Sequence, residues 1–181
     1  LIFEGIAVPE DVQKKVRESW RDGVFDIQRA DDSILALRTW LVNEDYLQPK
    51  VDYKITTPAE DRKHVVFDIQ PGPKFANVEL VFDGAQGMQP SKLRDVIGDQ
   101  KLTTDVYVAP GKVIETLTLL YQEFGYLDAE VKMPNYELNG QNATGKVIFP
   151  VTEGPLYRIR EVAFEGNSAI DDAKLAAAVP F

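Results

Sequence analysis

The sequence predicts an α+β protein built as a tandem array of small two-layer units. Each unit has the order strand-helix-helix-strand-strand, a three-stranded sheet and two helices on one face of it. One observation is a repeat: "GPKFANVELVFDGA" (72–85) aligns without a gap with "GPLYRIREVAFEGN" (154–167), at an offset of 82 residues. The other is that the apolar pattern within each period changes from alternation, typical of strands, to the i, i+4 spacing of helices and back.

Composition excludes several classes of protein. A hydrophobic content of 44% indicates a folded chain rather than a disordered one. The net charge of −9 disfavours nucleic acids and anionic lipid surfaces, which need clustered Lys and Arg. No apolar run reaches about 18 residues, so no membrane-spanning helix is predicted. Cysteine is absent, which is compatible with any compartment.

Each unit is expected to open with a short strand that ends at a glycine. Apolar residues dominate Leu1–Glu4 and Val78–Asp83, and Gly5 and Gly84 follow them. A first helix is predicted after each glycine, because apolar residues then recur at helical spacing. These residues are Val12, Val16 and Trp20 in the first unit, and Leu93 and Ile97 in the second.

The second helix of each unit shows a single apolar stripe, which predicts one buried face. The stripe residues are Ile34, Leu37 and Leu41 in the first unit, and Val113, Leu117, Leu120 and Phe124 in the second. Gly125 stands where a left-handed residue usually ends a helix. The first unit has Asp45 at that position.

Two further strands complete each unit. "DYLQPKVDYKI" (45–55) aligns with "GYLDAEVKMPN" (125–135) at an offset of 80 residues. Turn-rich connections follow at 56–63 and 139–145. Between the aligned strands the second unit has two more residues than the first (136–145 against 56–63), which accounts for the change of offset to 82. The last strands carry Val65, Phe67 and Ile69, and Val147, Phe149 and Val151. Pro150 falls inside the second of them, so we expect either a bulge there or a shorter strand.

The Gly-Pro turns mark the joints and divide the chain into 1–75, 76–156 and 157–181. The third piece has only an opening strand and one helix, from Ser168 or Asp171 through Val179. Since it lacks the strands that would pair with it, we expect it to be poorly ordered or borrowed by a neighbouring molecule. The chain begins at Leu1 without a basic and apolar leader, so we expect it to be a piece of a longer protein.

Two motifs carry a resemblance to a known family. They are "LYQEFGYLDAEV" (120–131) and "EGPLYRIREVAFEGN" (153–167), in which a Gly-Pro turn leads through an aromatic residue into a strand. The chain resembles the polypeptide-transport-associated (POTRA) domains of outer-membrane β-barrel assembly and secretion proteins, a group that includes BamA and TamA. The first unit departs from the pattern at Asp45 and lacks an Asn after Gly5.

The resemblance implies a non-catalytic periplasmic module that precedes a C-terminal membrane barrel. Its implied partners are unfolded outer-membrane proteins or peptide strands, periplasmic lipoproteins or accessory subunits, and no nucleic acid. An open sheet edge can bind such clients by strand addition. The predicted edges are Lys50–Thr56 and Glu130–Tyr136, and the first is the better acceptor because Pro134 partly blocks the second. The candidate binding residues are Lys50, Val51, Asp52, Tyr53, Lys54, Ile55, Glu130, Val131, Lys132 and Met133.

Other functions have less support in the sequence. His64 is the only histidine and cysteine is absent, so a nucleophile and base pair is not expected. "RADDS" (29–33) and "GNSAIDD" (166–172) are interpreted as helix starts rather than metal ligands, and no cofactor is expected. Two alternatives stay open: a structural spacer array, or the same domain in a secretion-pathway or division-type protein without a barrel.

Overall fold

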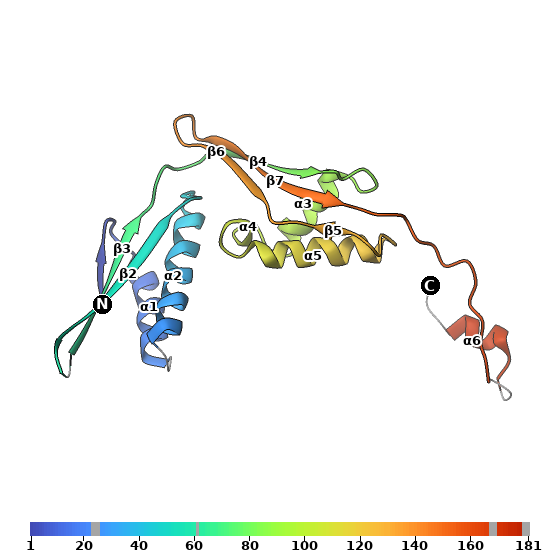
Figure 1. Ribbon diagram of the computed structural model, residues 1–181, viewed down its shortest axis with the longest axis horizontal. Helices are drawn as coiled ribbons and strands as arrows, with labels where there is room; N and C mark the ends of the chain where they lie inside the picture. The colour runs from blue at the N-terminus through green and yellow to red at the C-terminus, as the bar shows by residue number, and fades with distance from the viewer. Residues whose placement is uncertain (23–25, 61, 167–169, 179–181) are drawn as a thin grey trace.

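The computed structural model describes residues 1–22, 26–60, 62–166 and 170–178. Figure 1 shows two sheets, each covered by helices on one face, and a final extended segment that leads away to a short helix. The elements are β1 (Ile2–Glu4), α1 (Glu10–Asp22), α2 (Asp26–Asn43), β2 (Lys50–Ala59), β3 (Arg62–Gln70), β4 (Asn77–Asp83), α3 (Pro90–Asp99), α4 (Asp105–Val108), α5 (Pro110–Glu123), β5 (Glu130–Val131), β6 (Asn135–Asn139), β7 (Thr144–Thr152) and α6 (Asp172–Ala178).

The last strand of each unit lies in the centre of its sheet. The first sheet has the order β1-β3-β2, and the second has the order β4-β7-β5 with β6 also paired to β7. The opening strands β1 and β4 run parallel to the central strands, whereas β2, β5 and β6 run antiparallel to them. The predicted α+β architecture and strand order are confirmed. The short helix α4, inserted between the two main helices of the second unit, was not predicted.

The prediction of one continuous strand over Glu130–Tyr136 is wrong, because the chain forms β5 and β6 with residues 132–134 between them. The Lys132 backbone N–H donates to the Pro150 oxygen at 2.9 Å, but Pro150 has no N–H to donate in return. Val131 pairs with Val151 and Asn135 with Ile148, so residues 132–134 lie opposite 149–150 as a bulge. β7 therefore runs through Pro150 at full length, and the irregularity falls on the edge strand.

The hairpins are longer than predicted. β2 continues past Thr56 to Ala59, with a register shift between these two residues, and β3 begins at Arg62. β2 ends at Ala59 and β3 begins at Arg62, whereas β6 ends at Asn139 and β7 begins at Thr144. The connection between the strands is thus two residues longer in the second hairpin, which confirms the predicted reason for the change of repeat offset from 80 to 82.

Each sheet packs its helices around a separate core. The predicted inward residues of the central strands are buried in both units: Val65, Phe67, Ile69, Val147, Phe149 and Val151. In α5 the buried stripe is Val113, Leu117 and Tyr121. Leu120 is partly buried and packs against the same core, as predicted. The predicted place of Phe124 in the stripe is wrong, since Phe124 is 50% exposed at the position that ends the helix.

Both long helices end in the same backbone motif despite different residues. Asp45 has φ 68° and Gly125 has φ 89°. In each unit the next N–H bonds back to the helix, from Tyr46 to the Leu41 oxygen and from Tyr126 to the Tyr121 oxygen, at 2.9 and 3.0 Å. This is a Schellman cap, which needs a left-handed residue. Aspartate tolerates that conformation better than most residues, so the first unit forms the cap without glycine.

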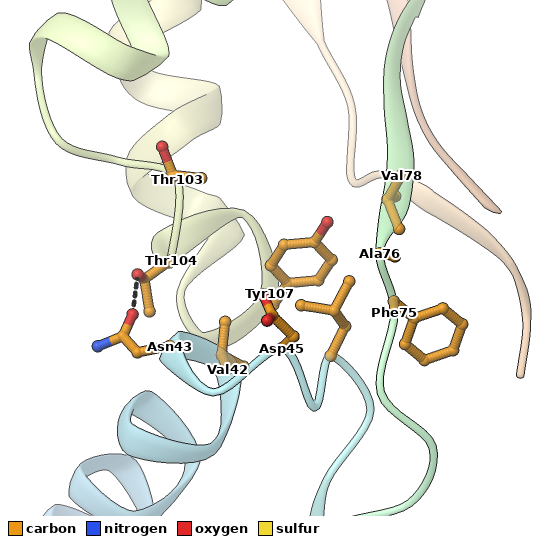
Figure 2. Close-up of a pocket in the computed structure, with 10 residues that line it drawn as sticks. Val42, Asn43, Asp45, Phe75, Ala76, Val78, Thr103, Thr104 and Tyr107 are labelled. Carbon is orange, nitrogen blue, oxygen red and sulfur yellow. Dashed lines mark hydrogen bonds between the residues drawn. The ribbon is translucent and has the colours of Figure 1, made fainter. Parts of the chain in front are cut away.

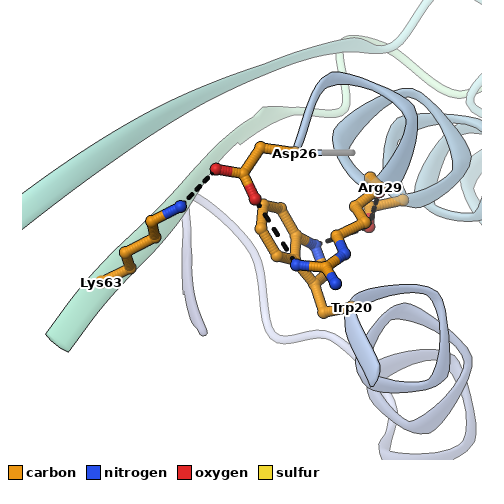
Figure 3. Close-up of polar contacts among 5 residues, drawn as sticks. Trp20, Asp26, Arg29 and Lys63 are labelled. Carbon is orange, nitrogen blue, oxygen red and sulfur yellow. Dashed lines mark hydrogen bonds and ion pairs between the residues drawn. The ribbon is translucent and has the colours of Figure 1, made fainter. Parts of the chain in front are cut away.

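A polar cluster ties the helices of the first unit to its hairpin (Figure 3). The Trp20 Nε1 donates to Ser33 Oγ at 3.0 Å, and Ser33 Oγ donates to the Arg29 backbone oxygen at 2.6 Å. Lys63 of β3 donates to Asp26 at the start of α2, and this hydrogen bond lowers the pKa of the Asp26 carboxyl. The sequence had predicted a helix start at residues 29–33. This prediction is wrong, because α2 begins at Asp26 and these residues lie inside it.

Residues 157–166 form no strand among the described residues, so the predicted opening strand of the third unit is not observed. In the first two units the opening strand pairs with the last strand of its own unit, and residues 157–166 have no strand partner among the described residues. The predicted helix is observed as α6, and its predicted starts at Ser168 and end at Val179 lie outside the described residues.

We expect Gly84→Ala to lower the free energy of unfolding by roughly 2–4 kcal/mol in urea denaturation. Gly84 has φ +95°, and a Cβ there would lie 2.2 Å from the Val151 oxygen, so both the strand end and the central strand must shift. Gly98→Ala is the matched control, because a Cβ at Gly98 in α3 meets nothing within 4 Å. This control should gain about 0.5 kcal/mol, and equal losses in both variants would contradict the steric explanation.

Deleting residues 160–181 should leave the melting temperature of the chain within about 2 °C of its original value. Nearly all described side chains from Arg160 onward are exposed, so little core is lost. Concentration-dependent association, measured by sedimentation, should decrease because exposed apolar side chains such as Val162 are removed. A large loss of melting temperature in the monomer would show that this segment completes the second core.

Candidate functional site

β2 presents a long, regular backbone edge in the described part of the chain. Its residues from Lys50 to Thr56 pair one by one with β3, from Gln70 to His64. Among the described residues β2 has no ladder partner on its other side. The prediction that Lys50, Val51, Asp52, Tyr53, Lys54 and Ile55 form an edge strand is confirmed, while their binding of a client remains a prediction.

The side chains of β2 alternate between the two faces of the sheet. Val51 and Ile55 lie opposite the buried Ile69 and Val65 and pack against the first core. Tyr53 lies on the same face but is 36% exposed and outside that core. The apolar residues of β2 are thus mainly structural, as expected, and the free backbone is the part available for binding.

The second edge is less open. Glu130 and Val131 form β5, and Val131 is buried. Lys132 and Met133 lie in the bulge rather than in a strand, and Met133 is 61% exposed. Beyond the bulge, β6 is fastened to α4 by the Tyr136 hydroxyl, which donates to the Val106 oxygen at 2.6 Å. An added strand would find no regular ladder along this edge.

The solvent face of the first sheet carries a row of three carboxylates. Glu4 pairs with Asp68, and Asp68 pairs with Asp52, so one acidic side chain from each strand stands in register. These residues help line a shallow groove of about 390 Å³ together with Tyr53, Lys54, Thr56 and Val66. Like charges directly opposite one another destabilise a sheet, so this row should lower the stability of the first sheet.

A second cavity lies at the junction between the two units, where α4 meets the end of α2 (Figure 2). The Arg38 Nη2 donates to the Tyr107 backbone oxygen at 3.3 Å, and Thr104 Oγ1 donates to Asn43 Oδ1 at 2.6 Å. Burial, with a smaller effect of nearby Tyr136, raises the pKa of the Tyr107 hydroxyl to about 12. The sequence did not predict this cavity, because α4 is a single short turn and the repeat gives no sign of it in the first unit.

No candidate metal centre is found among the described residues. They hold no cluster of three or more His, Cys, Asp or Glu side chains that could bind a metal ion. His64 is exposed and lies in β3 rather than in a turn. Within the described ranges, none of the helices combines the length and the apolar character needed to cross a membrane.

The chain is similar to known proteins only at the level of solved three-dimensional structures. No protein-family model and no curated protein matches the chain. The crystal structure of POTRA domains 3–5 of Haemophilus influenzae BamA aligns with 97% of this chain and 73% of that chain, at 17% identity and a TM-score of 0.58. The chain has the POTRA-domain fold. BamA from Haemophilus ducreyi lacking POTRA domains 1–3 also matches, with a TM-score of 0.51.

The coverage of the POTRA structures varies. The H. ducreyi match has 14% identity and covers 83% of this chain and 28% of that one. The N-terminal domain of Omp85 from Thermosynechococcus elongatus has 16% identity, with 84% of this chain and 60% of that chain aligned at a TM-score of 0.47. The chain therefore spans only part of each of these POTRA-containing structures.

Removing the central charge of the carboxylate row should stabilise the first POTRA sheet. We expect Asp68→Asn to raise the free energy of unfolding by about 0.5 kcal/mol, because both neighbouring carboxylates lose a like charge. Urea denaturation at low ionic strength measures this gain, which should disappear in 1 M NaCl. Asp95→Asn, at an exposed position on α3, is the control. A gain that persists unchanged in high salt would show that charge repulsion is not its cause.

Proposed function

We propose that the chain is a non-catalytic periplasmic module of an outer-membrane barrel protein, which receives unfolded outer-membrane precursors or accessory subunits by β-strand addition. The observation that supports this best is the long edge of β2, regular over Lys50–Thr56 and unpaired on one side among the described residues. The POTRA fold supports the placement in the periplasm, next to the outer membrane to which a barrel would attach it. We also propose that the units are residues 1–75, 76–156 and the start of a third, 157–181.

The two faces of β2 suggest which strands would fit beside it. A strand added to this edge would place alternate residues next to Val51, Tyr53 and Ile55, where Tyr53 is already exposed. The other residues would extend the row that contains Asp52, Asp68 and Glu4. A client strand that alternates apolar with polar or basic residues satisfies both faces. Strands of transmembrane barrels alternate apolar and polar residues in this way.

The expected affinity is low. Each backbone hydrogen bond contributes about 1 kcal/mol net, and an added strand makes roughly one such bond per residue. Association and ordering of an extended peptide cost at least about 4 kcal/mol. The surplus over the length of Lys50–Ile55 is small, so binding should be weak and readily reversed. Such binding suits a module that must release its client.

A proline substitution on β2 tests the proposal. Residues 53 and 54 alternate in direction, so one of Tyr53→Pro and Lys54→Pro removes an outward N–H and the other removes a bond to β3. The variant that keeps its circular dichroism spectrum should bind an extended barrel-derived peptide about tenfold more weakly in a fluorescence titration, as expected for one or two lost hydrogen bonds.

Met133→Pro is the matched control, because Met133 lies in the bulge of the second edge and is already followed by Pro134. Its binding isotherm should equal that of the unsubstituted chain. If both β2 variants fold and bind as tightly as the unsubstituted chain, strand addition at β2 is excluded. The spacer array, in which the edge has no client, would then be the better account.

A further inference from the structure

We infer that the cavity at the end of α5 is a docking socket for the following repeat, and that it receives the connection between the first two helices of the unit that begins at Tyr157. This inference rests on the proposed third unit, and it is independent of strand addition at β2. The cavity, here called the second socket, has a volume of about 470 Å³. Its lining residues are Gln122, Glu123, Gly125, Leu127, Tyr157, Arg158 and Ile159.

The second socket repeats a cavity at the first junction, where residues of the second unit complete the lining. That first socket, of about 510 Å³, is lined by Val42, Asn43, Asp45, Leu47, Phe75, Ala76, Val78, Thr103, Thr104 and Tyr107. At the repeat offsets of 80 and 82 residues, every residue of the second socket except Ile159 aligns with a residue of the first. The two cavities are thus one structural feature, produced once by each unit.

The backbone geometry of the two sockets is the same. At the first junction the Phe75 N–H donates to the Asp45 oxygen at 2.9 Å, and at the second the Tyr157 N–H donates to the Gly125 oxygen at 2.8 Å. Both acceptors are the left-handed residues that end the long helices. At the second junction the Tyr157 hydroxyl also donates to Asp128 Oδ2 at 2.7 Å. The second socket is therefore already formed, with its aromatic residue fixed in position.

The sockets differ in what covers them. Thr103, Thr104 and Tyr107 of the second unit complete the first socket, and none of the residues that line the second socket comes from an equivalent segment. The side chains of the second socket are also more exposed than their counterparts in the first. Phe75 is 4% exposed but its counterpart Tyr157 is 47% exposed, and Leu127 is 56% exposed where Leu47 is half-buried. Apolar surface of this kind, formed at a fixed place in each repeat, indicates an interface.

The side chains of the second socket also indicate the chemistry of the occupant. At the first junction Asn43 accepts a hydrogen bond from the Thr104 hydroxyl, and the residue aligned with Asn43 is Glu123. A carboxylate is purely an acceptor, so the incoming connection should present a hydroxyl or an amine to Glu123. It should also bring an apolar or aromatic side chain toward the exposed Leu127 and Tyr157.

Hydroxyl-radical footprinting with mass spectrometry tests this inference on native side chains. The 181-residue chain is compared with the longer protein that contains a complete third repeat. Tyr157 and Leu127 should be modified readily in the short chain and at least about fivefold more slowly in the longer one. Phe75 should be slow in both chains, and Leu119, which is 53% exposed on α5 outside the socket, should be fast in both.

A matched pair of substitutions in the longer protein shows whether the protection of Tyr157 from hydroxyl radicals depends on the second socket. Leu127→Lys should restore the modification of Tyr157, because a charged side chain displaces the apolar contact, whereas Leu119→Lys should leave Tyr157 protected. Hydrogen exchange of residues 160–165 reports separately whether the third unit has formed its opening strand. Slow exchange there with Tyr157 still fully modified would overturn the socket inference and leave the strand-addition proposal untouched.

Two other occupants give different results. A second copy of the chain would protect Tyr157 in the 181-residue chain in proportion to its concentration. A bound client would protect Tyr157 only after a barrel-derived peptide is added. Either result would overturn the inference that the next repeat fills the socket.

Discussion

The parallel pairing of the first strand of each unit with its last strand is the constraint on which the rest of the structure depends. β1 pairs with β3 and β4 with β7, so no sheet is complete until the whole unit has been traversed. The central strand then has one edge strand parallel to it and one antiparallel. Residues 157–166, which have no strand partner among the described residues, form no strand. The smallest part of the chain that pairs the central strand on both sides is therefore the whole unit, and not the individual hairpin.

The same pairing fixes where an edge can be open. Once the central strand is occupied on both sides, backbone groups face outward only from the two outer strands. In the second unit, Pro150 in the centre disturbs the outer strand at Lys132 because it supplies no N–H. The first unit has Asp68 at the aligned position, which does supply one, and β2 is regular from Lys50 to Thr56. A single residue in the interior of the sheet therefore makes two repeats of one fold unequal as binding surfaces.

The contacts at the junctions orient each unit relative to the next one. The Gly-Pro turn brings an aromatic N–H to the carbonyl at the end of the long helix in both units. This contact places the start of the next unit beside the end of the previous helix, so that α4 can pack against α2. The orientation of neighbouring units thus follows from local backbone hydrogen bonds together with one short helical turn.

The sequence by itself determined the repeat, the order of elements and the inward faces of β3 and β7. These features depend on periodicity and on turn residues such as Gly84 and Gly125, which act locally. It did not determine the bulge at residues 132–134, the helix α4 or the buried place of Tyr121 instead of Phe124. Each of these depends on a partner distant in sequence: Pro150 across the ladder, the end of α2 across the junction, and the core beneath α5. The tertiary structure alone decided them, because backbone pairing and burial are settled only when these distant segments are in contact.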